Sequence, residues 1–329
     1  MDVERYKSKK QWAGEAVPSM KRRRVGHDYQ ERCIYMITLA VEGRQNLLGD
    51  VTGDGINQAA VMQPSPLGRA ILAELAAIPA HYPTIKILAS QLMPDHLHFV
   101  IFVQRRLPCH LSRVISGYKG GCNRLYRQLC GLDPHASLWE QGFNDRILEG
   151  KGHLQRMIDY INDNPRRLAV KRHCHDYFKI RHDVQAGGNT FAAQGNLSLL
   201  VAPRRLQVQC SRSLTQEQIA TACRHFVEQA RNGAVLISPS ISPGERKVMT
   251  AAFELGLPTI ILLENGFAEL AKPGGRYFDA CARGQLLLLA PWRHHNTKDT
   301  IERHQCLALN DMAAAIATEP LHRPWLEQP

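Results

Sequence analysis

The sequence predicts two domains of different class, an α+β domain with an antiparallel sheet followed by an α/β domain. The chain has 329 residues, about the length of two ordinary domains, and 44% of them are hydrophobic, which is enough for two packed cores. In the first half two strands follow one another directly between helices, whereas after residue 204 strands and helices alternate. This change of pattern separates the two domains.

The first domain is expected at residues 31–175, behind a polar and basic tail at residues 1–30. The stretch from 42 to 65 is rich in turn residues and has the composition of a hairpin. Strands are expected at 33–41, 84–91, 96–104 and 143–148, and helices at 66–78, 111–129 and 152–164, the first opened by Pro66 and the last stopped by Pro165. The resulting order β-α-β-β-α-β is that of the ferredoxin-like fold, an antiparallel sheet whose first and third strands are central.

The second domain is expected at residues 204–329, after a linker at 176–203 that contains Gly187, Gly188 and Pro203. Its expected strands are 206–210, 234–237, 259–263 and 286–289, and its expected helices are 215–232, 244–255 and 310–318. Strands that alternate with helices form βαβ units with a parallel sheet, so this domain is predicted to be Rossmann-like.

The composition indicates a basic protein. Lysine and arginine outnumber aspartate and glutamate by 41 to 30, which gives a formal charge of +11. Such an excess favours a polyanionic partner, with nucleic acid as the first choice, although a basic protein without this partner has the same composition. Basic clusters at residues 20–24, 119–127 and 165–172 place the polyanion on the first half of the chain.

The cysteines and the hydropathy indicate where the protein works. The nine cysteines are scattered and form no CxxC pair, which is typical of reduced thiols in a cytoplasmic protein. No run of about 18 apolar residues is present, so no membrane span is expected, and the polar N-terminus argues against a secretory signal. With a nucleic-acid partner, the expected location is the bacterial cytoplasm, at the nucleoid.

The stretch MPDHLHFVIF places two histidines in an apolar strand. Alternate residues of a strand share a face, so His96 and His98 point one way and Leu97 and Phe99 the other. Two neutral imidazoles on one face suit a divalent metal ion, and an ordinary polar surface is the alternative.

The helix that precedes Pro165 has two distinct faces. Tyr160 and Asn164 are four residues apart and therefore share one face, whereas Met157 and Ile161 share another face that is expected to pack on the sheet. A nucleophile beside an amide ligand is one interpretation of the first face. The alternative is an amphipathic edge that ends in a capping asparagine.

In combination, these motifs resemble the single-tyrosine HUH transposases, with the REP-associated tyrosine transposases as the closest branch. The resemblance rests on His96-Leu97-His98, on WEQGFNDR at residues 139–146 and on DYINDNP at residues 159–165. It extends over about residues 30–175. The same motifs occur in the same order and on the corresponding elements of that family.

The resemblance implies metal-dependent nicking and joining of single-stranded or hairpin DNA, as in DNA transposition and recombination. His96, His98 and Asn164 would hold Mg²⁺ or Mn²⁺, and Tyr160 would attack the phosphorus to form a 5′-phosphotyrosine intermediate. Asp145 and Arg146 would orient a ligand or touch a phosphate, unless they form an ordinary surface pair. Phosphates would also be contacted by Lys119, Arg124, Arg166 and Arg167.

The second domain has a polar turn, SPSISPGE, directly after an expected strand. Ser242 and Gly244 open the next helix and could bind an anion there, but Ser242 and Glu245 also have the spacing of a capping box. The segment from Gly233 to Phe267 is similar to DNA-processing protein A and to lysine-decarboxylase-like proteins. This similarity implies that the domain binds DNA or a nucleotide.

Two other functions remain open at this stage. The first domain could bind nucleic acid without cutting it, with an empty histidine pair. Alternatively, the protein could be a domesticated transposase with a regulatory or defence role. The sequence also leaves open whether the protein acts as a monomer or as a homodimer.

Overall fold

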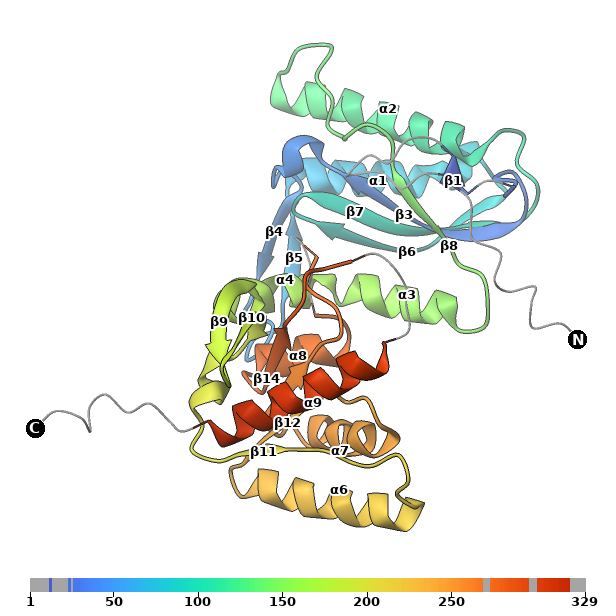
Figure 1. The fold of residues 1–329 in the computed structure, drawn as a ribbon. Coiled ribbons are helices and arrows are strands. Elements are labelled where there is room, and N and C mark those ends of the chain that lie inside the picture. Colours follow the sequence, from blue (N-terminus) through green and yellow to red (C-terminus); the bar gives the residue numbers. More distant parts are fainter. Residues whose placement is uncertain (1–11, 14–22, 25, 269–272, 296–300, 320–329) are drawn as a thin grey trace, which may run out of the picture. The chain divides into compact units, whose positions relative to one another are not determined.

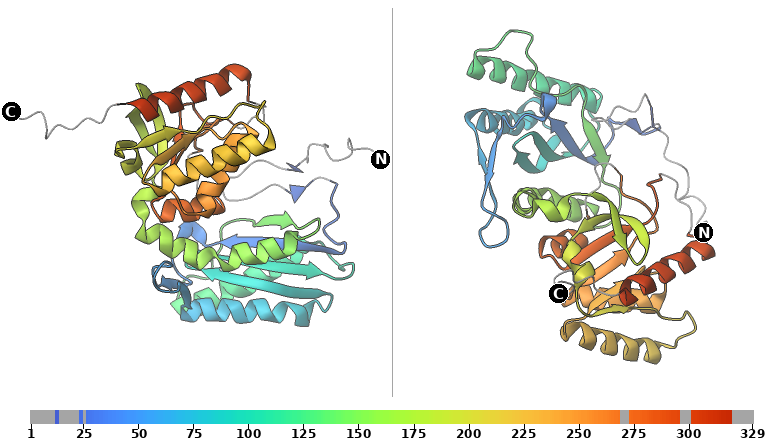
Figure 2. Two further views of the ribbon diagram at one scale, coloured as in Figure 1. Left: turned by 90° about the horizontal axis from the view of Figure 1, so that it is seen from below. Right: turned by 60° about the vertical axis from the view of Figure 1, so that its left-hand side comes forward.

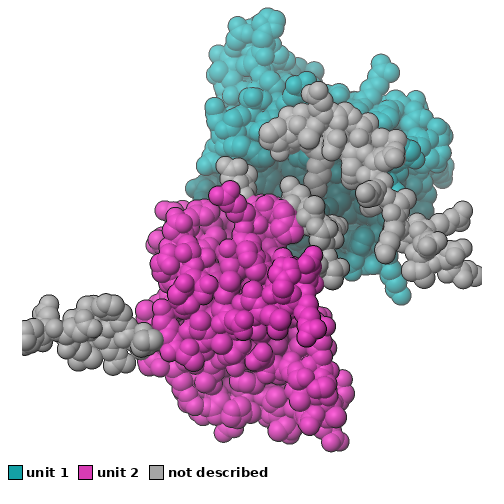
Figure 3. Space-filling view, viewed as in Figure 1, with its two compact units in different colours: residues 1–172 teal, residues 173–329 magenta. Residues whose placement is uncertain are grey.

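The computed structural model describes residues 12–13, 23–24, 26–268, 273–295 and 301–319. The chain divides into two compact units, residues 1–172 and 173–329, which Figure 3 distinguishes by colour. Both units mix helices and strands, which confirms the prediction of a mixed α and β chain at this coarse level.

The first unit is built on a four-stranded sheet with the strand order β6-β7-β3-β8, in which all neighbours are antiparallel (Figure 1). The histidine strand β7 is therefore one of the two central strands, as expected. The elements of the sheet and its helices are β3 Cys33–Ala40, α1 Pro66–His81, β6 Ile85–Met93, β7 His96–Val103, α2 Leu111–Cys130, β8 Asn144–Ile147, α3 His153–Asn162 and α4 Asn164–His173.

Helices cover both faces of this sheet. Leu97 and Phe99 of β7 face α1 and α2 and lie in one core with Ile71 and Val114. On the opposite face, Val100 packs against Met157 and Ile161 of α3. This contact confirms that Met157 and Ile161 pack on the sheet, and Figures 1 and 2 show α3 on the face opposite to α1.

A hairpin of β4 Gly49–Thr52 and β5 Val61–Pro64 interrupts the chain between β3 and α1, where turn residues predicted it. It projects beyond the four-stranded sheet (Figures 1 and 2). Gly55 at its tip lies so close to Arg166 and Val170 of α4 that a Cβ atom would come within 2.9 Å of both. The hairpin therefore packs on α4 as well as on α1.

Two boundaries of the first unit differ from the prediction. The expected tail at residues 1–30 extends too far, because Tyr29 is buried in the core. Within this tail the structure describes the short antiparallel pair β1 Trp12–Ala13 and β2 Arg23–Arg24. The remaining residues of the basic cluster, 20–22, lie outside the described residues. Pro165 does not end the helical segment. It lies in the first turn of α4, where its missing N–H would have had no helical partner, so Asn164 begins α4 and is not on the tyrosine helix α3.

The second unit is built on a six-stranded sheet with the order β11-β12-β13-β14-β10-β9. The first four strands are parallel, as the alternating pattern predicted, and β10 and β9 add antiparallel to β14. The elements are α5 His175–Phe178, β9 Arg181–Ala186, β10 Asn189–Gly195, β11 Arg205–Gln207, α6 Gln216–Arg231, β12 Val235–Ser238, α7 Pro243–Glu254, β13 Thr259–Leu262, α8 Arg276–Ala282, β14 Leu286–Ala290 and α9 Arg303–Thr318.

The expected linker at residues 176–203 is wrong, because β9 and β10 of this segment extend the sheet of the second unit. The turn at Gly187 and Gly188 that suggested a linker is the turn of this hairpin. The short helix α8 was not expected, since seven residues carry too little periodic pattern to stand out. Helix α9 begins at Arg303, ahead of the predicted start at 310.

The described residues contain neither a membrane-spanning helix nor a disulfide. No helix within the described residues is long and apolar enough to cross a membrane. All nine cysteines lie in the described part of the chain, and all are free thiols.

Candidate active site

The site begins with the two histidines of β7. The register of β3 and β7 pairs His96 with Ala40 and His98 with Thr38. Because the two imidazoles share one face of the strand, their Nε2 atoms lie only 3.1 Å apart. His98 is 8% exposed, whereas the His96 side chain is 20% exposed, so the pair lies at the edge of the buried region.

The second nitrogen of each histidine has its own partner. Nδ1 of His96 donates a hydrogen bond to Oδ1 of Asp95 at 2.5 Å, and Nδ1 of His98 lies 2.8 Å from Oγ1 of Thr38. A carboxylate only accepts, so Nδ1 of His96 holds a proton, and in the neutral ring Nε2 of His96 carries the lone pair. Such outer partners fix the ring orientation of histidines that bind metals.

The surroundings of His98 and Asp95 shift the pKa values of both side chains. Burial, and after it the charge of a protonated His96, lower the pKa of His98 to about 3, so its ring is neutral at physiological pH. Burial acts to raise the pKa of Asp95, but the hydrogen bond from His96 and the charges of His96 and Arg44 outweigh it and lower that pKa. Asp95 is therefore an ionised partner for His96.

The geometry of the pair fits one divalent ion. Two nitrogens that each bind an ion at about 2.1 Å and at a right angle lie about 3 Å apart, close to the 3.1 Å observed between the Nε2 atoms. Within the described residues, no three or more His, Cys, Asp or Glu side chains gather as a metal site. An amide, a water or an oxygen of the substrate could supply a further ligand.

Asn164 is the residue that the resemblance to HUH transposases implies as the third metal ligand. It begins α4, and its Nδ2 atom is buried without a hydrogen-bond partner. A buried donor without a partner is costly, and the partner that Nδ2 lacks is an acceptor, whereas a cation would be bound by the Oδ1 atom of Asn164.

Tyr160 shares a cavity with His98. Met157 and Ile161 hold α3 against the sheet, and Tyr160 lies on another side of this helix with 48% of its surface exposed. A cavity of about 240 Å³ is lined by Tyr160, His98, Thr38, Met36, Asn144, Asp145 and Arg146. The structure thus brings the phenol and the buried imidazole to one cavity.

Asp145 and Arg146 follow each other on β8 and point to opposite faces of the sheet. Arg146 pairs with Met36, is exposed and lines the cavity on the side of Tyr160. Asp145 is 4% exposed and accepts a hydrogen bond of 3.1 Å from the hydroxyl of Tyr29. Arg146 is therefore the member of this pair that is placed to meet a phosphate.

The other expected phosphate contacts differ in position. Lys119 is half-buried, burial lowers its pKa, and its Nζ donates to the backbone carbonyls of Glu140 and Gly142. Through these bonds Lys119 holds the loop before β8. Arg124 is exposed on α2, which packs on the opposite face of the sheet from α3.

Arg166 and Arg167 belong to α4. Nε and Nη2 of Arg166 bond both carboxylate oxygens of Asp163, at 2.6 and 3.0 Å, so this guanidinium is already engaged in an ion pair. The backbone N–H of Arg167 donates to the carbonyl of Asp163. Both arginines thus follow directly on the turn that joins α3 to α4.

Sequence reasoning missed four side chains of this site: Thr38, Asp95, Asn144 and Arg44. Thr38 and Asn144 are partners across β3 and β8, and Arg44 lies 3.5 Å from Asp95. A signal for Thr38 was present, since it continues the alternating row of Ile34 and Met36 as a polar residue in an apolar strand.

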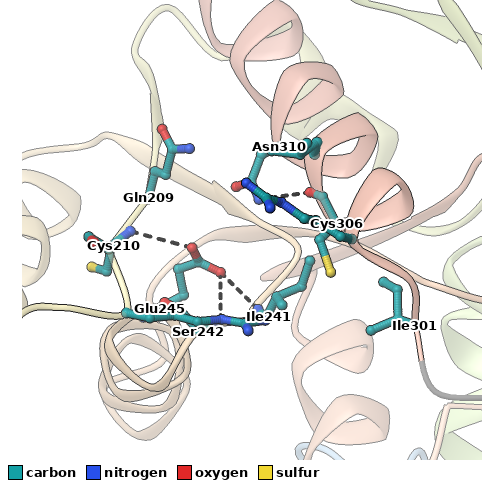
Figure 4. Close-up of a pocket in the computed structure, with 12 residues that line it drawn as sticks. Gln209, Cys210, Ile241, Ser242, Glu245, Ile301, Cys306 and Asn310 are labelled. Carbon is teal, nitrogen blue, oxygen red and sulfur yellow. Dashed lines mark hydrogen bonds between the residues drawn. The ribbon is translucent and has the colours of Figure 1, made fainter.

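In the second unit, the expected anion site at Ser242 and Gly244 is a helix cap. Oγ of Ser242 accepts from the backbone N–H of Glu245, and the carboxylate of Glu245 accepts from those of Ser242 and Ile241, as Figure 4 shows for the carboxylate. Gly244 has no room for a side chain, because a Cβ would lie 2.6 Å from Cβ of Cys210. The capping alternative therefore accounts for these residues.

Comparison with known proteins yields distant similarities. No protein-family model matches the sequence. An uncharacterized protein of Haemophilus influenzae is 24% identical over 156 residues, which cover 42% of this chain and 83% of that protein.

Two solved structures are also similar. A REP-associated tyrosine transposase bound to a REP hairpin matches 44% of this chain and 72% of its own, with 15% identity and a TM-score of 0.31. DNA processing protein A of Helicobacter pylori, described for its mode of binding single-stranded DNA, matches 44% and 67%, with 16% identity and a TM-score of 0.33. Scores this low assign neither the fold nor the activity of this chain.

Proposed function

We propose that the first unit is a ferredoxin-like domain that nicks and joins single-stranded DNA by transesterification through Tyr160. The supporting observation is that Tyr160 and His98 line one cavity, while Nε2 of His98 and Nε2 of His96 lie 3.1 Å apart with their other nitrogens occupied. The strand order β6-β7-β3-β8 fits the ferredoxin-like fold, and the resemblance of the motifs to single-tyrosine HUH transposases points to the same reaction.

In the proposed reaction the Tyr160 oxygen forms a bond to the phosphorus, and the bond from phosphorus to the 3′ oxygen of the preceding nucleotide breaks. The departing strand leaves with a free 3′-OH, and the following strand stays joined to Tyr160 through its 5′ phosphate. A second 3′-OH reverses the step. One ester replaces another each time, so joining requires no external energy source.

The remaining side chains would position the phosphate. His96, His98 and Asn164 would hold Mg²⁺ or Mn²⁺, which when bound withdraws charge from a phosphate oxygen as a Lewis acid. Arg146, exposed at the same cavity, would meet the phosphate from β8. Asp95 and Thr38 would keep both imidazoles in the orientation that presents Nε2.

The test is a covalent adduct between the protein and DNA. The protein is incubated with Mn²⁺ and a set of single-stranded and hairpin oligonucleotides that carry a label at the 3′ end, because the strand on that side stays attached. Denaturing gels then reveal a labelled protein band. We expect the band with the unmodified protein and its loss with Tyr160→Phe, with His96→Ala and on addition of a chelator.

A matched control is Tyr126→Phe, because Tyr126 is a partly buried tyrosine of α2 that packs with the core on the other face of the sheet. This variant should form the adduct at the normal rate. An adduct that persists in Tyr160→Phe would contradict the proposal. If oligonucleotides bind but no adduct forms under any condition, the unit is a non-catalytic nucleic-acid-binding domain.

For the second unit we propose a Rossmann-like fold, since four parallel strands and the helices between them follow the alternating order of such domains. Ligand binding by this unit is a separate question. A role in transposition and a retained role in regulation or defence would use the same chemistry of the first unit, and the DNA that flanks the gene would distinguish them.

A further inference from the structure

The turn that follows β3 has an uncommon backbone conformation. Gly43 and Arg44 both have a positive φ, of 62° and 56°, and belong to a short 3₁₀ turn at Glu42–Arg44. Glycine adopts this left-handed conformation freely, whereas for other residues it is uncommon and costs free energy. A glycine at position 44 would remove this cost, so the strained position points to a role for the arginine side chain.

This turn is bound to two other segments of the first unit. The backbone N–H of Val41 donates to the carbonyl of Asp95 at 2.8 Å, and the backbone N–H of Glu140 donates to that of Ala40 at 2.9 Å. The end of β3 is thus joined by backbone hydrogen bonds to the turn before the histidine strand β7 and to the segment before β8.

The Arg44 side chain connects the same two segments through their carboxylates. Its Nη1 atom lies 3.5 Å from Oδ2 of Asp95, and its Nε atom lies 3.4 Å from Oε1 of Glu140. The other oxygen of Asp95, Oδ1, accepts the 2.5 Å hydrogen bond from Nδ1 of His96. Glu140, Arg44 and Asp95 therefore form a continuous chain of charged groups that ends at the His96 ring.

Both carboxylates of this chain are partly buried and rely on the guanidinium for compensation. The Glu140 side chain is 18% exposed, and its Oε2 atom is buried without a hydrogen-bond partner. Because a desolvated charge without a partner is costly, removal of Arg44 would favour rotation of both carboxylates toward solvent. Rotation of Asp95 would break its hydrogen bond to His96, and the ring would lose its fixed orientation.

A second effect of Arg44 has the opposite sign. Burial is the main cause of the low pKa of His98, and the positive charge of Arg44 also contributes to it. A charge that disfavours a proton on His98 also disfavours a metal cation beside it. If Arg44 acted as a charge alone, its removal would therefore strengthen cation binding. The sign of the change distinguishes this effect from the loss of orientation.

We propose that Arg44 is a positioning residue for His96: it holds Asp95 from the far side, so that the ring presents its Nε2 atom beside that of His98. Glu140 fixes the guanidinium in turn. The orientation gained outweighs the repulsion between Arg44 and the cation. The inference rests on the proposed function for the choice of ion, Mg²⁺ or Mn²⁺, whereas the hydrogen bond that Arg44 supports can be measured without metal.

The first measurement is Mn²⁺ binding to the full-length chain without DNA, by isothermal titration calorimetry. Arg44→Gly should bind Mn²⁺ about tenfold more weakly than the unmodified protein, the lower end of the usual range for loss of an outer partner. Glycine relieves the backbone at this position, so this variant should unfold at a higher denaturant concentration than Arg44→Ala. Arg44→Lys keeps a cation between the carboxylates and should recover part of the affinity.

Two further variants assign the measured effect. Arg106→Ala is the matched control, because Arg106 is an exposed arginine of the same unit that also contacts two carboxylates, those of Asp28 and Glu31. It should bind Mn²⁺ as tightly as the unmodified protein. His96→Ala should lose the binding, which assigns the measured ion to the histidine pair.

The second measurement detects the hydrogen bond itself. In a ¹⁵N–¹H spectrum of the histidine side chains, the Nδ1–H of His96 should give a separate signal, shifted downfield by its bond to Asp95. Arg44→Gly should move or broaden this signal and leave that of His27, whose Nε2 lies 2.8 Å from the Tyr35 hydroxyl, unchanged. Because Arg44 acts through Asp95, adding Arg44→Gly to Asp95→Ala should not weaken Mn²⁺ binding further.

Tighter Mn²⁺ binding by Arg44→Gly would show that Arg44 acts as a charge alone and would overturn the proposal. An unchanged His96 signal in Arg44→Gly, or weaker binding when this change is added to Asp95→Ala, would overturn it as well. Absence of Mn²⁺ binding by the unmodified protein would reject both this role and the proposed metal site. If these effects occur but no DNA adduct forms, the proposed function fails and the positioning role of Arg44 stands.

Discussion

The hydroxyl of Thr38 lies 2.8 Å from Nδ1 of His98, across the register that pairs β3 with β7. This contact connects a residue with no chemistry of its own to the buried imidazole of the candidate site. As acceptor, Oγ1 of Thr38 would hold the proton on Nδ1 of His98 and leave Nε2 for an ion.

Removal of this hydroxyl should therefore weaken metal binding. We expect Thr38→Val, which keeps the shape of the side chain, to lower the affinity for Mn²⁺ by about 10- to 100-fold, the usual effect of losing a partner of a metal-binding histidine. Isothermal titration calorimetry measures it. Thr52→Val in the β4–β5 hairpin is the control, and equal affinities of the two variants would refute the role of Thr38.

His98 should make the first unit sensitive to acid. Its pKa is about 3 in the folded protein and 6.5 in the absence of burial, so the unfolded chain takes up the proton first as the pH falls. The resulting loss of stability begins near pH 6.5 and reaches about 2 kcal/mol by pH 5. Denaturant unfolding at pH 7.5 and pH 5 measures it, and His98→Asn should lose less stability over the same interval than the unmodified protein.

Ile161 should control both the stability of the first unit and the position of Tyr160. It is fully buried against Val100, and its removal leaves a cavity under α3. Ile161→Ala is expected to cost about 2–4 kcal/mol and to reduce adduct formation further than the fraction unfolded explains. Ile158→Ala, at a partly buried position of α3, should cost less. Normal adduct formation by folded Ile161→Ala would show that this packing does not position the phenol.

Substitution of Arg146 should mainly affect DNA binding, whereas substitution of Lys119 should mainly affect stability. Arg146→Ala is expected to weaken DNA binding at all sequences and to lower the salt dependence by about one counterion, with little effect on stability. Lys119→Met leaves the carbonyls of Glu140 and Gly142 without their donor and should cost about 1–3 kcal/mol. Fluorescence anisotropy at several salt concentrations, with unfolding curves beside it, distinguishes the two. A normal salt dependence in Arg146→Ala would remove Arg146 from the phosphate contacts.

The sequence by itself determined most of the helices and strands of the first unit and which of their residues share a face. Alternation placed His96 and His98 together on β7, and helical spacing placed Met157 and Ile161 against the sheet, because these periodicities act within a few residues. The same local rules explain the capping of α7 by Ser242 and Glu245. The same rules gave the wrong prediction at Pro165, because proline is common both just after a helix and in the first turn of the next one.

Only the tertiary structure decided what lies across from each face. The partners of His98 and Arg146, namely Thr38 and Met36, come from β3, more than fifty residues away in the chain, and pairing at that distance leaves no local signal. The hairpin β9–β10 likewise left no local signal: its residues were predicted to be a linker, and in the structure β10 pairs with β14. A cavity beside Trp292 lies next to this pairing. Local periodicity selects a face, and the packing of distant segments decides whether that face becomes a core, a surface or a site.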